Sequence, residues 1–207
     1  KASEPDLQVI SRDVRKVQAQ ALVVGVGQSP DGPVLVDSPL SQKSSSAVAG
    51  SFALLGVTGA ADQVVRLPGL PELDAEMLVL AGLGPVAAGE PLSTEALRRA
   101  AGSAVRQLAG TETVALALPA ATVEDAAAVA EGALLGAYSF TEFRSAHSAK
   151  APAAVSRITV ITSTAGEAEL KSAMERAQIV ARAVNATRTL VNQPPSHLYP
   201  ETFAAAA

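Results

Sequence analysis

The sequence predicts an α/β fold with a mixed, largely parallel sheet, helices on both faces and a long helix after the sheet. One observation behind this is the alternation of short β-branched segments with longer segments whose apolar residues recur every three or four positions. That alternation is typical of strands connected by helices. The other is that residues 21–26 are almost continuously apolar, as expected for a strand buried on both faces.

Composition narrows the class of protein. The 207 residues are 48% hydrophobic but only 3% aromatic, so the core must consist of Val, Leu, Ile and many alanines. Because there is no cysteine, disulfide scaffolds and thiolate metal sites are excluded. The net charge of −4 gives no support to a nucleic-acid-binding surface. No apolar run approaches the roughly 20 residues of a membrane span, and we expect a cytoplasmic protein.

The other predicted strands are short β-branched runs bounded by turn residues. They are residues 7–10, 63–67, 76–81, 113–118 and 157–162. Residues 27–46 are rich in Gly, Ser, Pro and Asp, which predicts a long loop. Loops of this length are uncommon inside compact domains, so a mobile excursion is expected here.

Helices are predicted over residues 47–55, 93–109, 122–143 and 166–192. Ser93 is suited to cap the second of these, and Thr122 with Asp125 resembles a capping box for the third. The last helix would be about 40 Å long. This exceeds what one small domain needs, so its C-terminal end is expected to leave the first domain.

Glycine pairs follow two of the predicted strands, at Gly25 and Gly27 and at Gly82 and Gly84. Neither pair completes a dinucleotide-binding fingerprint. We interpret them as tight strand-ending turns. An anion held by backbone N–H groups at such a turn stays an alternative.

No constellation of catalytic residues is present. His147 and His197 lie in loop-like sequence, and the acidic residues lack metal-ligand spacing. We expect a structural or surface role for both histidines. Arg98, Arg99 and Arg106 are interpreted as a solvated helix face, with DNA binding as the competing hypothesis.

Two segments carry more information. Residues 131–145 contain a small-residue notch, Gly132 and Gly136, which predicts close packing of a neighbouring backbone, with Tyr138 and Phe140 near the end of the same helix. Residues 183–203 contain a junction in which the long helix stops and prolines fix the turn that follows. The junction residues are Asn192, Gln193, Pro194, Pro195 and Pro200.

These two segments resemble the cytosolic leucyl aminopeptidase family, namely a helix of its N-terminal domain and the junction before its catalytic domain. There are departures, because the family usually has Thr where this chain has Gln193, Asn in place of Ser196 and Thr in place of Tyr199. The resemblance implies a macro-domain-like sheet and a linker helix. It also implies a larger catalytic domain that removes N-terminal residues from peptides, in a homo-hexamer.

In that family two divalent metals, Mn or Zn, are bound by motifs that this sequence lacks, so the resemblance assigns no catalytic or metal-binding residue here. We therefore predict an N-terminal α/β domain (1–165), an interdomain linker helix (166–192) and the start of a catalytic domain (193–207). The segment would be inactive alone, bind no cofactor and contact its own catalytic domain, while peptide substrates bind elsewhere. The alternative is a free-standing macro-like module that binds a nucleotide or ADP-ribose.

Overall fold

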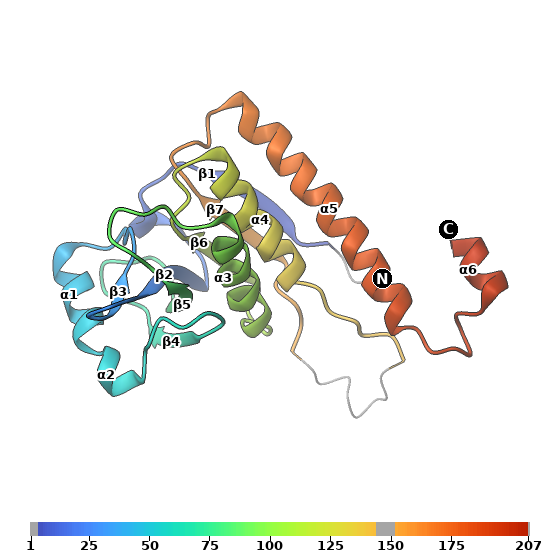
Figure 1. Ribbon diagram of the computed structural model, residues 1–207, viewed down its shortest axis with the longest axis horizontal. Helices are drawn as coiled ribbons and strands as arrows, with labels where there is room; N and C mark the ends of the chain where they lie inside the picture. Colours follow the sequence, from blue (N-terminus) through green and yellow to red (C-terminus); the bar gives the residue numbers. More distant parts are fainter. Residues whose placement is uncertain (1–3, 144–151, 207) are drawn as a thin grey trace.

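The computed structural model describes residues 4–143 and 152–206, which form a seven-stranded sheet with helices packed on it (Figure 1). The strands are β1 (Asp6–Ile10), β2 (Ala21–Ser29), β3 (Gly32–Leu35), β4 (Val64–Pro68), β5 (Met77–Pro85), β6 (Thr113–Ala117) and β7 (Arg157–Ile161). Their order is β1-β7-β6-β2-β5-β4, and β3 pairs with β2. Five strands are parallel neighbours, whereas β3 and β4 run antiparallel to their partners. The predicted mixed, largely parallel sheet is confirmed.

The helices cover both faces of this sheet. They are the 3₁₀ turn η1 (Val14–Lys16) and the helices α1 (Gln42–Gly50), α2 (Phe52–Leu55), α3 (Thr94–Gln107), α4 (Val123–Gly136), α5 (Ala168–Asn192) and α6 (Pro200–Ala206). Successive residues of β2 enter different cores, because side chains alternate across a strand. Val23 belongs to the core shared with α3, α4 and α5, whereas Leu22 and Val24 belong to the core shared with α1 and α2.

Helices α3 and α4 begin at the capping residues that the sequence predicts. Ser93 accepts a hydrogen bond from the N–H of Ala96 at the start of α3. At α4, Thr122 and Asp125 form both bonds of a capping box, although Asp is less usual than Glu or Gln at that position. These caps fix where the two helices that carry most of the apolar surface begin.

The prediction of a long loop over residues 27–46 is wrong. The strand β2 continues to Ser29, β3 follows as its hairpin partner, and α1 begins at Gln42. Two features allow this polar stretch to form a strand. Gly32 takes up a left-handed φ of 119° beside the turn, and Pro33 is tolerated because β3 lies off the main strand path and pairs with β2 alone among the described strands.

The predicted helix at 122–143 is too long, because α4 ends at Gly136. Glycine weakens a helix, and Phe143 has a φ of 62° that no α-helix accommodates. Tyr138 and Phe140 therefore lie in an irregular segment after α4 rather than on it.

The 25-residue α5 runs beside α4 and continues past its end, and α6 is set apart from the sheet (Figure 1). Within the described parts of the chain, we find no helix with the combination of length and apolar character required to cross a membrane.

Candidate functional site

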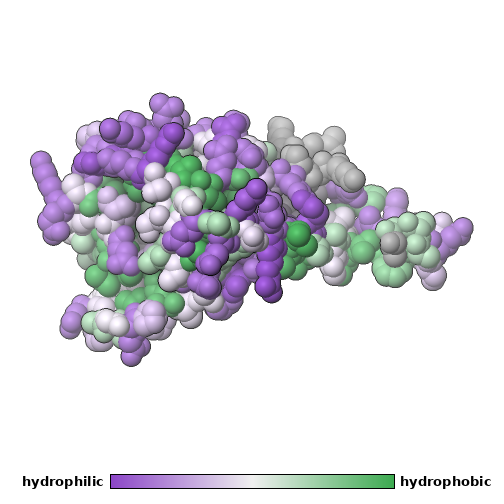
Figure 2. All heavy atoms as spheres, turned by 90° about the horizontal axis from the view of Figure 1, so that it is seen from above, coloured by the Kyte–Doolittle hydropathy of each residue, from purple (hydrophilic) through white to green (hydrophobic). Residues whose placement is uncertain are grey.

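The candidate functional site is the surface around the C-terminal half of α5. The first half is anchored by four buried side chains spaced three or four residues apart: Leu170, Met174, Ala177 and Ala181. Beyond Ala181 no side chain of α5 is fully buried. Apolar side chains nevertheless continue there, and Val184 and Val191 are 40% and 79% exposed. Figure 2 shows hydrophobic atoms at the surface where the end of α5 and α6 project on the right.

Side chains from α5 donate hydrogen bonds to the free carbonyl groups at the C-terminal end of α4. The last carbonyls of a helix lack intrahelical partners, and α4 has no basic residue in its last turn. Asn185 Nδ2 donates to the carbonyl of Leu134 at 3.4 Å, and Arg188 Nη1 donates to that of Leu135 at 2.8 Å. The guanidinium therefore brings a positive charge to the negative end of the α4 dipole.

Tyr138 lies at the centre of the same contact region. The Arg188 guanidinium lies over its ring, 4.1 Å from the centroid, in cation–π geometry. Its hydroxyl lies 3.2 Å from Thr189 Oγ1 and accepts a 3.2 Å hydrogen bond from Asn192 Nδ2. We call these five residues, Tyr138, Asn185, Arg188, Thr189 and Asn192, the Tyr138 cluster.

Sequence reasoning identified Tyr138 and Asn192 but assigned no role to the other three members of the cluster. The signal was present, because Asn185, Arg188, Thr189 and Asn192 recur at three- and four-residue spacing and so share one helix face. The same face of the helix is apolar in the preceding turns. Polar residues on it here indicate that this part of the helix contacts polar groups rather than the apolar core.

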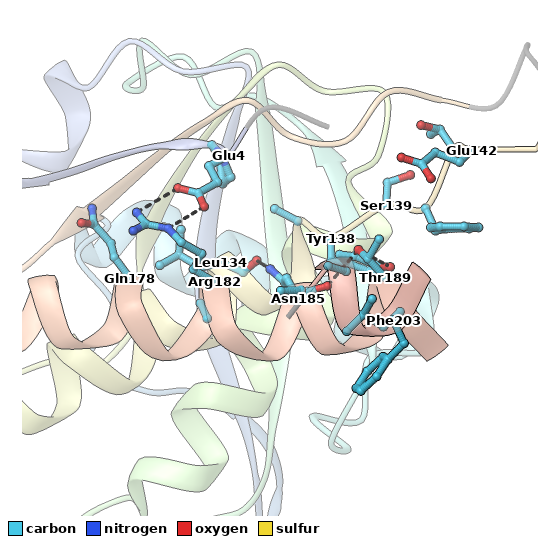
Figure 3. A pocket seen from close by; sticks show the side chains of 18 residues that line it. Glu4, Leu134, Tyr138, Ser139, Glu142, Gln178, Arg182, Asn185, Thr189 and Phe203 are labelled. Atoms are coloured by element: carbon cyan, nitrogen blue, oxygen red, sulfur yellow. Dashed lines mark hydrogen bonds and ion pairs between the residues drawn. The ribbon is translucent and has the colours of Figure 1, made fainter. Parts of the chain in front are cut away.

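A cavity of about 600 Å³ lies between α5, the segment after α4, and α6. Figure 3 shows the Glu4–Arg182 ion pair at one end, with Arg182 Nε donating to Glu4 Oε1 at 2.8 Å. Asn185 and Thr189 line it further along α5, and Phe203 of α6 lies near Thr189. The cavity has both apolar and charged walls, which is typical of a surface that contacts another protein segment.

The predicted junction motif follows α5 directly. Gln193 is extended (ψ 136°), as a residue before proline must be, and its N–H still reaches the carbonyl of Leu190. The carbonyl of Pro194 then accepts the N–H groups of His197 and Leu198, which closes a turn that also contains Pro195.

Tyr199 cannot cap α6 with its own side chain, and Thr202 takes over part of that role. Its Oγ1 accepts the N–H of Tyr199 at 2.9 Å, which is the reverse half of a capping box. Pro200 occupies the first helical position, where a missing N–H costs nothing. The hydrogen bond that Thr202 accepts therefore compensates for the side-chain cap that Tyr199 cannot provide at the start of α6.

His197 packs against Phe143 with ring centroids 4.4 Å apart and ring planes tilted by 54°, and its Nδ1 lies 3.0 Å from Ser196 Oγ. Phe143 in turn lies 6.2 Å from Phe140. His147 falls outside the described residues. Across residues 4–143 and 152–206 no group of three or more His, Asp or Glu side chains is placed to hold a metal ion.

Gly132 and Gly136 face the backbone of α3. A Cβ atom on Gly132 would overlap the carbonyl of Arg98, and one on Gly136 would overlap that of Gly102. The two helices can approach this closely only because glycine stands at these positions.

The glycine pairs of β2 and β5 are not strand-ending turns, as was expected, but lie inside the strands. A bulge shifts the register so that Gly27 is opposite Gly84. The N–H of Gly82 bonds the carbonyl of Gln63 at 2.8 Å, and that of Gly84 bonds the carbonyl of Gly59 at 2.9 Å. Because the protein's own chain takes these donors, the two groups are not available to an anion.

The basic residues of α3 are largely paired with carboxylates. Arg98 binds Glu95 at 2.6 Å and Glu131 at 3.0 Å, and Arg99 binds Asp62. This pairing lowers the positive charge that DNA binding through Arg98, Arg99 and Arg106 would need.

The family comparison matches the description "Cytosol aminopeptidase family, N-terminal domain" over residues 21–147. A probable cytosol aminopeptidase of Micrococcus luteus is 52% identical over 200 residues, covering 95% of this chain and 39% of that protein. The probable cytosol aminopeptidase of Rhodococcus erythropolis is 38% identical over 207 residues, with 98% and 39% covered.

Two solved structures share the fold. The bottromycin maturation enzyme BotP in complex with Mn has a TM-score of 0.61 at 25% identity, over 90% of this chain and 35% of that one. A mutant of tomato leucine aminopeptidase has a TM-score of 0.72 at 20% identity, over 99% of this chain and 42% of that one.

The fold is that of an α/β domain with a mixed sheet and a long C-terminal helix. The chain belongs to the cytosol aminopeptidase family and corresponds to its N-terminal domain. It spans 39% of the length of the Micrococcus luteus relative.

Proposed function

We propose that this chain is the N-terminal, non-catalytic domain of a leucyl-type aminopeptidase, in which it supports assembly and controls access to the active sites. The observation that carries the proposal is the exposed apolar flank on the C-terminal half of α5, formed by Val184 and Val191. An apolar helix flank of this kind is typical of a docking surface. The relatives are longer than this chain, and their additional length would supply the partner.

In this proposal residues 1–165 form the domain, 166–192 the linker helix and 193–207 the start of the catalytic domain. The parent enzyme would be a cytoplasmic homo-hexamer that releases N-terminal amino acids from peptides. When bound, two divalent metals would supply Lewis-acid activation of the scissile carbonyl. We assign those metals, Mn or Zn, to the catalytic domain, since the described residues contain no suitable ligand group.

Catalysis is tested by assaying leucine-anilide hydrolysis with added manganese, on this chain and on the full-length protein that contains it. We expect turnover only from the full-length protein. Robust turnover by this chain would overturn its assignment as non-catalytic.

Docking is tested in the full-length protein by replacing Val184 and Val191 with Asp. Leu54→Asp is the matched control, because Leu54 is 89% exposed but lies on α2, remote from α5 (Figure 1). We expect the α5 variant to lose hexamer on size-exclusion chromatography and the control to retain it. Equal assembly of both variants would contradict a docking role for α5.

A further inference from the structure

The last turns of α5 are held to the domain by polar contacts rather than by apolar burial. Between Ala181 and Asn192 the only half-buried side chains are Asn185, Arg188, Thr189 and Leu190. Three of these four belong to the Tyr138 cluster. At 1.5 Å per residue, this part of α5 runs for about 16 Å without a buried apolar anchor.

Apolar contact alone would not fix the direction of α5. The buried surface of α4 consists mainly of alanines and a glycine, and the last two buried residues of α5, Ala177 and Ala181, are also alanines. Small side chains give a smooth contact surface on which a helix can slide or rotate. Directional hydrogen bonds, in contrast, specify a single register.

The Tyr138 cluster supplies that direction through several independent contacts. Arg188 bonds the Leu135 carbonyl, stacks on Tyr138 and also bonds Asn185 Oδ1 at 3.1 Å. Asn192 reaches the Tyr138 hydroxyl one helical turn further on. The contacts join both the end of α4 and the segment after it to the last two turns of α5.

We propose that the Tyr138 cluster is a joint that locks the direction of α5, with Tyr138 and Arg188 as its positioning residues. In terms of the proposed function, the joint would set where the catalytic domain stands relative to the sheet. The lock itself is a property of this chain, so its test is independent of catalysis and can fail separately from the proposed function.

The test measures distances between two spin labels on this chain. Because the chain contains no cysteine, labels can be placed at introduced cysteines only. The reporting pair joins the exposed Glu124 at the start of α4 to the exposed Val191 at the end of α5. The reference pair joins Glu124 to the exposed Lys171, on the part of α5 that is anchored by apolar burial.

In Tyr138→Ala and Arg188→Gln variants we expect the distance distribution of the reporting pair to become about twofold wider, while the reference pair is unchanged. Tyr138→Phe keeps the ring under Arg188 and should broaden the distribution less. Arg176→Gln is the matched control, because it removes the same charge from an exposed position of α5.

Two results would overturn the lock. One is a reporting distribution that stays narrow in both variants. The other is equal broadening of both pairs, which would mean that the residues only stabilise the fold. Should Tyr138→Ala fail to fold, Asn192→Ala gives the same comparison, because it removes one bond to the Tyr138 hydroxyl and leaves the ring in place.

Discussion

Gly132 of α4 faces the main-chain carbonyl of Arg98 in α3 so closely that a Cβ atom on Gly132 would overlap the oxygen. Backbone cannot move aside as a flexible side chain can. Gly132→Ala is therefore expected to lower the free energy of unfolding by about 2 kcal/mol or more. Gly50→Ala is the control, because open space surrounds Gly50 in α1, and we expect it to be neutral or to stabilise by less than about 1 kcal/mol. Urea denaturation measures both, and equal stability of the two variants would contradict the packing role.

Thr122 begins α4 through a capping box in which its hydroxyl accepts the N–H of Asp125 at 3.1 Å. We expect Thr122→Ala to cost about 1 kcal/mol of unfolding free energy, because the N–H of Asp125 loses its partner. Thr122→Ser keeps the hydroxyl and should stay close to the parent. A Ser variant as unstable as the Ala variant would show that the hydroxyl is not responsible.

Asp62 joins the loop before β4 to α3. Its hydrogen bond from Arg99, followed by that from Ser103, lowers the pKa of the carboxyl from 3.8 to about 2. Since the folded pKa is below the unfolded one, the stabilisation is present above pH 3.8 and is lost as the pH falls towards 2. The side chain is 38% exposed, so the effect should be about 1 kcal/mol or less.

Asp62→Asn tests this pH dependence without backbone strain, because Asn tolerates the left-handed φ of 69° at this position. The variant should be less stable than the parent at neutral pH, and the difference should close between about pH 4 and pH 2. Denaturant titrations across this range measure it. A difference that does not change with pH would contradict the role of the charge.

Calorimetric titration with ADP-ribose tests the alternative of a nucleotide-binding module. We expect no heat of binding, because Gly59 and Gln63 already occupy the N–H groups of Gly84 and Gly82. Saturable heat would show that this loop moves aside and would restore the alternative.

The strands and helices with strong periodicity could be predicted from the sequence, including β2, β5 and α3. The strand β3 could not, because Gly32 and Pro33 disfavour strands in general and are accepted here only in a hairpin that pairs with β2 off the main strand path. The end of α4 was placed too late because the alanine-rich pattern carries no stop signal other than Gly136.

The candidate site was only partly predictable for a related reason. The prolines of the junction constrain their own neighbours, so Pro194 and Pro200 could be interpreted locally. The contacts of Arg188 with Leu135 and Tyr138 join positions about 50 residues apart. No local pattern encodes such a pair, although the helical spacing of the polar residues of α5 indicates that they share a face.

The pairing of β1 with β7 also has a consequence for synthesis on the ribosome. Asp6 pairs with Arg157 and Ile10 pairs with Ile161, so each residue of β1 pairs with one that is synthesised 151 positions later. At translation rates of about 5–20 residues per second, β1 remains without its partner for roughly 8–30 s. During that interval Leu7 and Val9 are accessible to chaperones, and this side of the sheet is completed only when β7 has emerged.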